Sequence, residues 1–121
     1  MAAHASLRGM TVVAIGRVYG LASSRRELVE LMRRAAAAAR TEPGCRSYDF
    51  AEALDRADEF VVVHEWDDRA ALAAHYRGAA HEAYQEGLHG LLARPSDLVI
   101  HEVASTERPV GRAAMDPRDA D

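Results

Sequence analysis

The sequence predicts an α+β fold, with an antiparallel four-stranded sheet and helices on one of its faces. Four short segments carry the apolar, period-two patterning of β-strands. Two longer segments, rich in Ala and Leu, place their apolar residues at helical spacing. The resulting order is β-α-β-β-α-β, which is that of a ferredoxin-like fold.

The first strand is predicted at residues 10–18. Val13, Ile15 and Arg17 share one side of it, and the other side is also largely apolar, so we expect both sides to be covered. Gly16 lies on that other side and leaves room for a close approach to the backbone.

The first helix is predicted to begin at Ser24. Ser24 and Glu27 have the spacing of a capping box, in which each end of the motif satisfies a free amide of the other. Pro43 and Gly44 follow the helix and stop it. The expected buried stripe consists of Leu28, Leu31, Met32, Ala35 and Ala39.

The second and third strands are predicted at residues 45–53 and 59–66. A polar connection at residues 54–58 makes them an antiparallel pair. Tyr48 and Phe50 share one face of the second strand. One face of the third strand carries Phe60, Val62, His64 and Trp66.

A second helical region is predicted at residues 69–92, with a break at Gly78. Asp67 and Asp68 end the third strand and offer side-chain oxygens that can cap the helix. The last strand is predicted at residues 97–103.

We expect one folded domain at residues 10–104, between a loose leader at residues 1–9 and a polar tail at residues 105–121. The net charge of −4 and the lack of a basic stripe argue against nucleic-acid binding. The single cysteine, Cys45, excludes an internal disulfide. No apolar run approaches the ~18 residues of a membrane span. No secretory signal is evident either, so a cytoplasmic location is expected.

Two stretches resemble a known family. TEPGCRSY has the pattern E-x-G-C-x-x-Y at a strand start, and FVVVHEWDDRAALAAHYRGAAHEAY joins E-x-W-x-[DS] to a helix with A-x-x-A-H and a second histidine. Together they resemble the antibiotic biosynthesis monooxygenase domain family over residues 10–104. The matching positions are Glu42, Gly44, Cys45, Tyr48, Glu65, Trp66, Asp68, Ala71, Ala74, His75 and His81.

The resemblance implies a homodimer, a dimeric α+β barrel with one pocket per subunit between sheet and helices. Members of the family include cofactor-free oxygenases of quinols and anthrones in aromatic polyketide pathways, haem-degrading proteins and an isomerase. The haem-degrading members have Asn, Trp and His where this chain has Gly16, His75 and Gln85, which argues against haem degradation. Polyketide oxygenases often have Asn at the position of Val62, so a hydrogen-bond donor must come from elsewhere.

We therefore expect a cofactor-independent monooxygenase that oxidises a phenolic, anthrone or quinol-type aromatic substrate to a quinone with molecular oxygen. The candidate catalytic residues are His75, Trp66 and His64, with His75 the first choice of base and His64 the second. The expected substrate-binding residues are Tyr48, Phe60, Val62, Leu72, His81, Tyr84 and Arg17. Tyr48, Arg17 or the indole N–H of Trp66 would donate a hydrogen bond to the substrate anion.

Each candidate also has a structural interpretation. Trp66 is equally well a core residue, and a buried neutral His64 satisfied by the backbone is the commoner case. An isomerase in which His75 and His81 shuttle a proton is one alternative, and a dimeric ligand-binding protein without turnover is another. Motifs for a metal, a flavin or NAD are missing, so none of these cofactors is expected.

Overall fold

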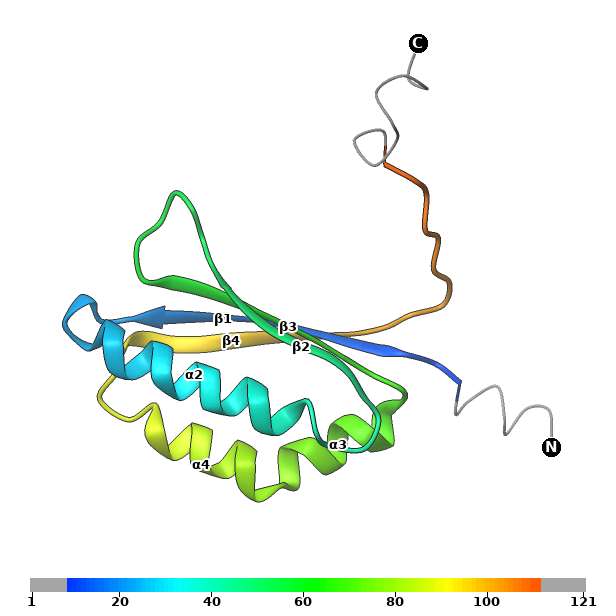
Figure 1. Ribbon diagram of the computed structural model, residues 1–121, viewed down its shortest axis with the longest axis horizontal. Helices are drawn as coiled ribbons and strands as arrows, with labels where there is room; N and C mark the ends of the chain where they lie inside the picture. Colours follow the sequence, from blue (N-terminus) through cyan, green and yellow to red (C-terminus); the bar gives the residue numbers. More distant parts are fainter. Residues whose placement is uncertain (1–8, 112–121) are drawn as a thin grey trace, which may run out of the picture.

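The computed structural model describes residues 9–111, and its order of elements confirms the predicted α+β fold (Figure 1). Within these residues the strands are β1 (Val12–Gly20), β2 (Cys45–Glu52), β3 (Glu59–Trp66) and β4 (Leu92–Glu102). The helices are α2 (Arg25–Ala39), α3 (Arg69–Arg77) and α4 (Ala79–Gly87), and a 3-10 turn, η1 (Ala22–Ser24), precedes α2. Most of the predicted leader and the end of the predicted tail lie outside the described residues.

The strands form one sheet in the order β2-β3-β1-β4, and every neighbouring pair is antiparallel. All three helices lie on the same face of this sheet (Figure 1). In β1, Val12, Ala14 and Val18 are buried on the side of the helices, whereas Arg17 is exposed on the opposite side. The period of two along each strand therefore decides which residues can reach a site between sheet and helices.

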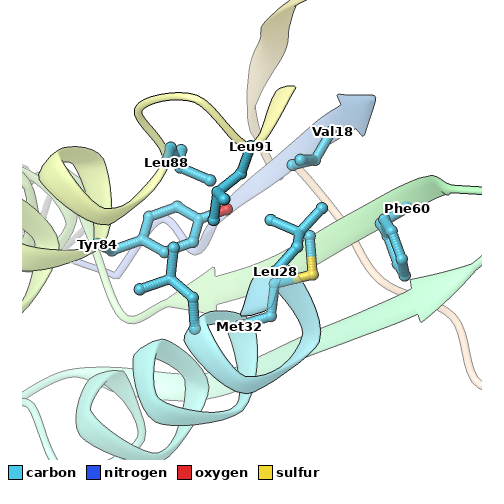
Figure 2. Close-up of a cluster of buried hydrophobic side chains, with 8 residues drawn as sticks. Val18, Leu28, Met32, Phe60, Tyr84, Leu88 and Leu91 are labelled. Atoms are coloured by element: carbon cyan, nitrogen blue, oxygen red, sulfur yellow. The ribbon is translucent and has the colours of Figure 1, made fainter. Parts of the chain in front are cut away.

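An apolar cluster fills the space between α2, α4 and one end of the sheet (Figure 2). Its members are Val18, Leu28, Leu31, Met32, Phe60, Tyr84, Leu88 and Leu91. Gly87 allows the two helices to approach, because a Cβ atom at this position would lie 2.6 Å from Cδ1 of Leu31. The predicted buried stripe of α2 is confirmed except at Ala35. Ala35 is only partly buried, and Ala36 is buried in its place.

A second cluster lies under α3 and surrounds Trp66, which is 0% exposed. Its other buried members are Val12, Ala36, Ala39, Tyr48, Val62 and Leu72. Unlike the first cluster, it also encloses the buried polar side chains of His64 and His75. The core is thus apolar under α2 and α4 and partly polar under α3.

The predicted capping box at the start of α2 is wrong. Ser24 is the N-cap residue, but its side chain makes no capping hydrogen bond. The backbone of Ser24 belongs to η1 and has φ −109° and ψ 9°. An N-cap side chain reaches the free amides from an extended backbone, which η1 does not provide.

The predicted boundary between the last helix and the last strand is also wrong. The α4 helix ends at Gly87 rather than near residue 92, and β4 begins at Leu92 rather than at Asp97. Pro95 therefore lies inside a strand, where it is tolerated because β4 is an edge strand of the sheet. The pairing of β1 with β4 shifts in register between Arg17 and Tyr19, so Pro95 falls in a bulge.

The face of the sheet away from the helices is apolar at its centre. Ile15 of β1 pairs with Val63 of β3 and with Val99 of β4. Val63 is 38% exposed and Val99 is 54% exposed, so no part of the described chain covers them. The cover predicted for this side of β1 is therefore not provided by residues 9–111.

The backbone conformation and close packing of Gly44 predict that its replacement destabilises the fold. It has φ +83°, and a Cβ atom there would lie 2.6 Å from Cβ of Ala71, whereas Gly90 has φ +80° and no neighbour within 4 Å. Both changes to Ala incur roughly 1–2 kcal/mol of backbone strain. Only Gly44→Ala adds overpacking, worth about 1–3 kcal/mol. Urea unfolding should therefore show a larger loss for Gly44→Ala, and equal losses for the two variants would contradict the packing argument.

Candidate functional site

A small cavity lies between the sheet and the pair of helices α3 and α4, and it has a volume of about 70 Å³. Strands contribute Gly16, Val18, Tyr48, Val62, His64, Ser96, Asp97 and Leu98 to its lining, and helices contribute Tyr76, His81, Tyr84 and Gln85. Gly16 keeps this space open, since a Cβ atom there would lie 2.9 Å from Cγ1 of Val62. The site is thus built from every strand of the sheet and from the two shorter helices.

His64 is held in place by two aromatic neighbours. The indole Nε1–H of Trp66 donates a buried hydrogen bond of 2.7 Å to Nδ1 of His64. The ring of Tyr48 stacks on that of His64 with a centroid distance of 4.4 Å. Burial, with smaller contributions from His75 and His81, lowers the pKa of His64 to about 4. His64 is therefore neutral at physiological pH.

The partner of His75 is a hydrogen-bond acceptor, whereas the partner of His64 is a donor. Its Nδ1 atom lies 2.6 Å from Oε1 of Glu42, while its side chain is 3% exposed. A carboxylate can only accept a hydrogen bond, so Nδ1 of His75 carries the proton in this pair. The Nε2 atom of His75 is buried and has no hydrogen-bond partner. In the neutral form of His75 this arrangement leaves a lone pair on Nε2, as a general base requires.

Three neighbouring rings bring unpartnered polar atoms together. His75 Nε2, Tyr76 Oη and His81 Nδ1 are buried without hydrogen bonds. The ring centroids of His75 and His81 are 5.0 Å apart, those of Tyr76 and His81 are 5.0 Å apart, and those of His75 and Tyr76 are 5.2 Å apart. Buried polar groups are normally satisfied, so such a cluster indicates a place for a bound polar group or water.

The local sequence explains why these rings meet. Asp68 caps α3 through a 2.9 Å hydrogen bond from the amide of Ala71, which fixes where the helix starts. Gly78 then separates α3 from α4 with an extended backbone. His75 in the last turn of α3 and His81 in the first turn of α4 therefore lie on either side of one bend.

The phenols around the cavity are all neutral at physiological pH. Burial raises the pKa of Tyr76 and that of Tyr84 to about 12, and it also raises the pKa of Tyr48. Burial, followed by the charge of His75, lowers the pKa of His81. The lining can thus donate and accept hydrogen bonds through side chains that are mostly neutral. The carboxylate of Asp97 instead accepts a 3.2 Å hydrogen bond from Oη of Tyr19, and the backbone oxygen of Asp97 is the atom that lies near Gly16.

The structure brings five of the predicted site residues into the lining, namely Tyr48, Val62, His64, His81 and Tyr84. His75 and Trp66 are not lining residues, although their rings lie 5.7 Å and 6.0 Å from that of His64. His75 and Trp66 therefore lie directly behind the cavity wall, next to His64. The expectation that His75 and Trp66 themselves line the cavity is not met.

Three predicted binding residues lie elsewhere. Phe60 belongs to the apolar cluster of Figure 2, and Leu72 packs in the cluster around Trp66. The prediction for Arg17 is wrong, because its guanidinium lies on the far face of the sheet and pairs with Glu59 at 3.6 Å. Its neighbour Gly16 lines the cavity, and successive strand residues point to opposite faces.

The lining residues not predicted from the sequence are Val18, Tyr76, Gln85, Ser96, Asp97 and Leu98. Gln85 had a usable signal, since it lies four residues after His81 and its Nε2 is 3.4 Å from Nε2 of His81. Ser96 had no such signal, because the bulge in β4 that contains it was not predicted.

Neither a metal centre nor a membrane helix is found in residues 9–111. In that range no group of three or more His, Cys, Asp or Glu side chains is arranged to hold a metal ion. No helix there has both the length and the apolar character needed to cross a membrane.

The model of the antibiotic biosynthesis monooxygenase family matches residues 11–87, so the chain belongs to this family. A relative, the uncharacterized protein sll1783 of Synechocystis sp., is 29% identical over 96 residues. That match covers 79% of this chain and 65% of the relative, so the chain spans less than two thirds of the relative's length.

Solved structures share the fold. Rv0793 of Mycobacterium tuberculosis has 28% identity and a TM-score of 0.72, with 83% of this chain and 99% of that chain covered. A candidate antibiotic biosynthesis monooxygenase of Deinococcus radiodurans has 23% identity and a TM-score of 0.78, with the same coverage of 83% and 99%. These likenesses support the predicted α+β fold.

The lowered pKa values of His64 and His81 generate a prediction about acid stability. Both side chains stay neutral in the native state below the ordinary histidine pKa of 6.5, whereas they take up protons in the unfolded chain. The free energy of unfolding should therefore fall as the pH decreases below about 6.5. The contribution of His64 should fall by up to ~1.4 kcal/mol per pH unit down to about pH 4.

Urea unfolding at a series of pH values checks this expectation. His64→Gln removes the titration but leaves an acceptor for the indole N–H, so its stability should fall less steeply with acid. His89→Gln, at an exposed position after α4, controls for the substitution itself. A pH dependence for His64→Gln as steep as that of the unsubstituted protein would contradict the assignment.

Proposed function

We propose that the protein is a cofactor-independent monooxygenase that oxidises a phenol, anthrone or quinol to a quinone with molecular oxygen. The observation that carries this proposal is the Glu42–His75 pair. It offers a buried, unpartnered Nε2 atom directly behind a cavity of neutral polar groups. Family membership supports a small-molecule reaction at this site.

The substrate supplies the electrons in the proposed chemistry. Nε2 of His75 takes the hydroxyl proton, and Glu42 stabilises the imidazolium that forms. The phenolate passes one electron to dioxygen, and the radical pair combines to form a C–O bond as a ring-bound peroxide. The O–O bond then breaks, the same ring carbon loses its hydrogen as a proton, and one oxygen leaves as water. Phenol plus dioxygen thus gives quinone plus water.

The size of the cavity narrows the substrate class. A volume of about 70 Å³ is well below the ~300–1,000 Å³ of typical ligand pockets. Entry of one ring edge demands less movement of α4 and β4 than entry of a fused polycycle. We therefore favour single-ring phenols and quinols over polycyclic anthrones.

An isomerase is the second candidate, and one observation favours it. The rings of His75 and His81 are 5.0 Å apart, and each has a buried nitrogen without a partner. Two such nitrogens can remove a proton from one atom of a substrate and return it to another. This reaction would proceed without oxygen consumption, which separates it from the first candidate.

Oxygen uptake with a panel of quinols and phenols tests the function and the role of the pair. His75→Ala should lower kcat at least ~100-fold, because it removes the general base. Glu42→Gln keeps an acceptor for Nδ1 but loses the charge, so its loss should be smaller, at about tenfold.

Glu86→Gln is the matched control, because Glu86 is an exposed glutamate on α4. Its rate should be unchanged. A His75→Ala rate per folded molecule equal to that of the unsubstituted protein would remove His75 as the base. Turnover of substrate under nitrogen would instead favour the isomerase.

We also propose that two copies pair through the uncovered face of the sheet. The apolar residues Ile15, Val63 and Val99 lie side by side there in register. Burial of such a surface contributes roughly 25 cal/mol per Å², which favours association of two copies. Two sheets packed face to face would form the dimeric α+β barrel that the family resemblance implies.

Sedimentation velocity at micromolar concentration should show a dimer. Val63→Arg should give a monomer, since it places a charge at the centre of this face. Leu54→Arg should stay dimeric, because Leu54 is fully exposed in the β2–β3 loop. A monomeric parent protein would disprove the proposed pairing.

A further inference from the structure

We propose that Trp66 fixes the tautomer of His64, so that His64 presents a permanent Nε2–H donor to an oxygen atom of the bound substrate. In this assignment His64 is a catalytic residue but not a base, and Trp66 is a positioning residue. The identity of the ligand rests on the proposed function. The tautomer of His64 rests only on the geometry of the two side chains.

The tautomer follows from the chemistry of the hydrogen bond. An indole N–H is a donor only, so the atom that it contacts must be an acceptor. That atom is Nδ1 of His64, at 2.7 Å, and the bond is buried. A neutral imidazole with an unprotonated Nδ1 carries its one proton on Nε2.

The surroundings oppose every other protonation state. A proton on Nδ1 would point at the indole N–H and would leave two buried donors facing each other. A second proton would place a charge on a side chain that is 2% exposed and whose ring lies 5.7 Å from that of His75. The other groups around His64 are the phenols of Tyr48 and Tyr76, which also stay neutral.

The donor faces the cavity. His64 is a lining residue and Trp66 is not, so the edge of the ring that carries Nδ1 is turned away from the cavity. The opposite edge carries Nε2. Stacking on Tyr48 with an interplanar angle of 30° holds the plane of the ring, so the direction of the N–H bond is set before the ligand arrives.

The roles of His64 and His75 determine which hydrogen-bonding groups the ligand must have. A fixed donor at His64 requires an oxygen acceptor, and a base at His75 requires a hydroxyl proton nearby. The hydroxyl group of a neutral phenol supplies both at one atom. As His75 removes the proton, negative charge grows on this oxygen, and the hydrogen bond from His64 strengthens. The contribution of His64 is therefore expected mainly in kcat.

Nitrogen NMR of the protein with labelled histidines tests the tautomer without any assay of activity. The parent protein should show His64 with a protonated Nε2 and an unprotonated Nδ1 from about pH 5 to pH 8. Trp66→Phe should produce a mixture of tautomers, because the indole donor is gone. Val12→Ala is the matched control, since Val12 is buried and pairs with Trp66 across β1 and β3 but does not line the cavity.

Oxygen uptake with hydroquinone tests the donor role. Trp66→Phe should lower kcat about tenfold, equal to ~1.4 kcal/mol of transition-state stabilisation, with little change in KM. Val12→Ala should keep the kcat of the parent per folded molecule. His64→Gln can still donate an N–H bond and should keep more activity than His64→Leu.

The results separate the two proposals. A protonated Nδ1 or a charged His64 in the parent protein would overturn the inference even if oxygen is consumed. Equal kcat values for Trp66→Phe and Val12→Ala, with different tautomers, would overturn the donor role. The predicted tautomer in a protein that consumes no oxygen with any phenol would disprove the monooxygenase and leave the pairing of Trp66 with His64 standing.

Discussion

The contact between Glu42 and His75 joins two segments that are 33 residues apart, and the geometry of the site depends on it. A charged carboxylate next to a nearly inaccessible imidazole is stable only when both keep hydrogen-bond partners. Glu42 is 21% exposed, so it retains some water while it holds the buried ring. Gly44 brings the two segments close, because its carbonyl accepts a 2.8 Å hydrogen bond from the amide of Asp67 just before α3. The turn before β2 and the start of α3 are therefore packed as one unit.

The division of the core into an apolar half and a polar half reflects a balance between stability and function. Leu28, Met32 and Phe60 fill the apolar half and need no polar partners. The half around Trp66 instead contains three buried polar atoms without partners, each of which destabilises the folded state by about 1–3 kcal/mol unless water or a ligand satisfies it. Such groups persist where the surrounding packing is strong, and they concentrate at functional sites.

Much of this architecture could be predicted from the sequence, because local patterns determine it. The alternation along β3 placed Val62, His64 and Trp66 on the correct face, and the Gly78 break was expected. The start of β4 could not be predicted, since Pro95 is a breaker in most settings and is tolerated only at a sheet edge with a bulge. The same bulge contains Ser96, which lines the cavity. The partner of His75 was also beyond the sequence, because Glu42 is 33 residues away and reaches it only through tertiary packing. Trp66, by contrast, lies two residues from His64 on the same face of β3.

Two histidines of the same site acquire opposite roles from their partners. A carboxylate accepts from Nδ1 of His75, so the neutral form of that ring has a lone pair on Nε2. An indole donates to Nδ1 of His64, so the neutral form of that ring has its proton on Nε2. Composition cannot distinguish these cases, since both residues are buried histidines beside aromatic rings. The chemistry is decided by one atom of a second residue in each case. A phenol that enters between them meets an acceptor and a donor already oriented, which is the arrangement that removal of its proton requires.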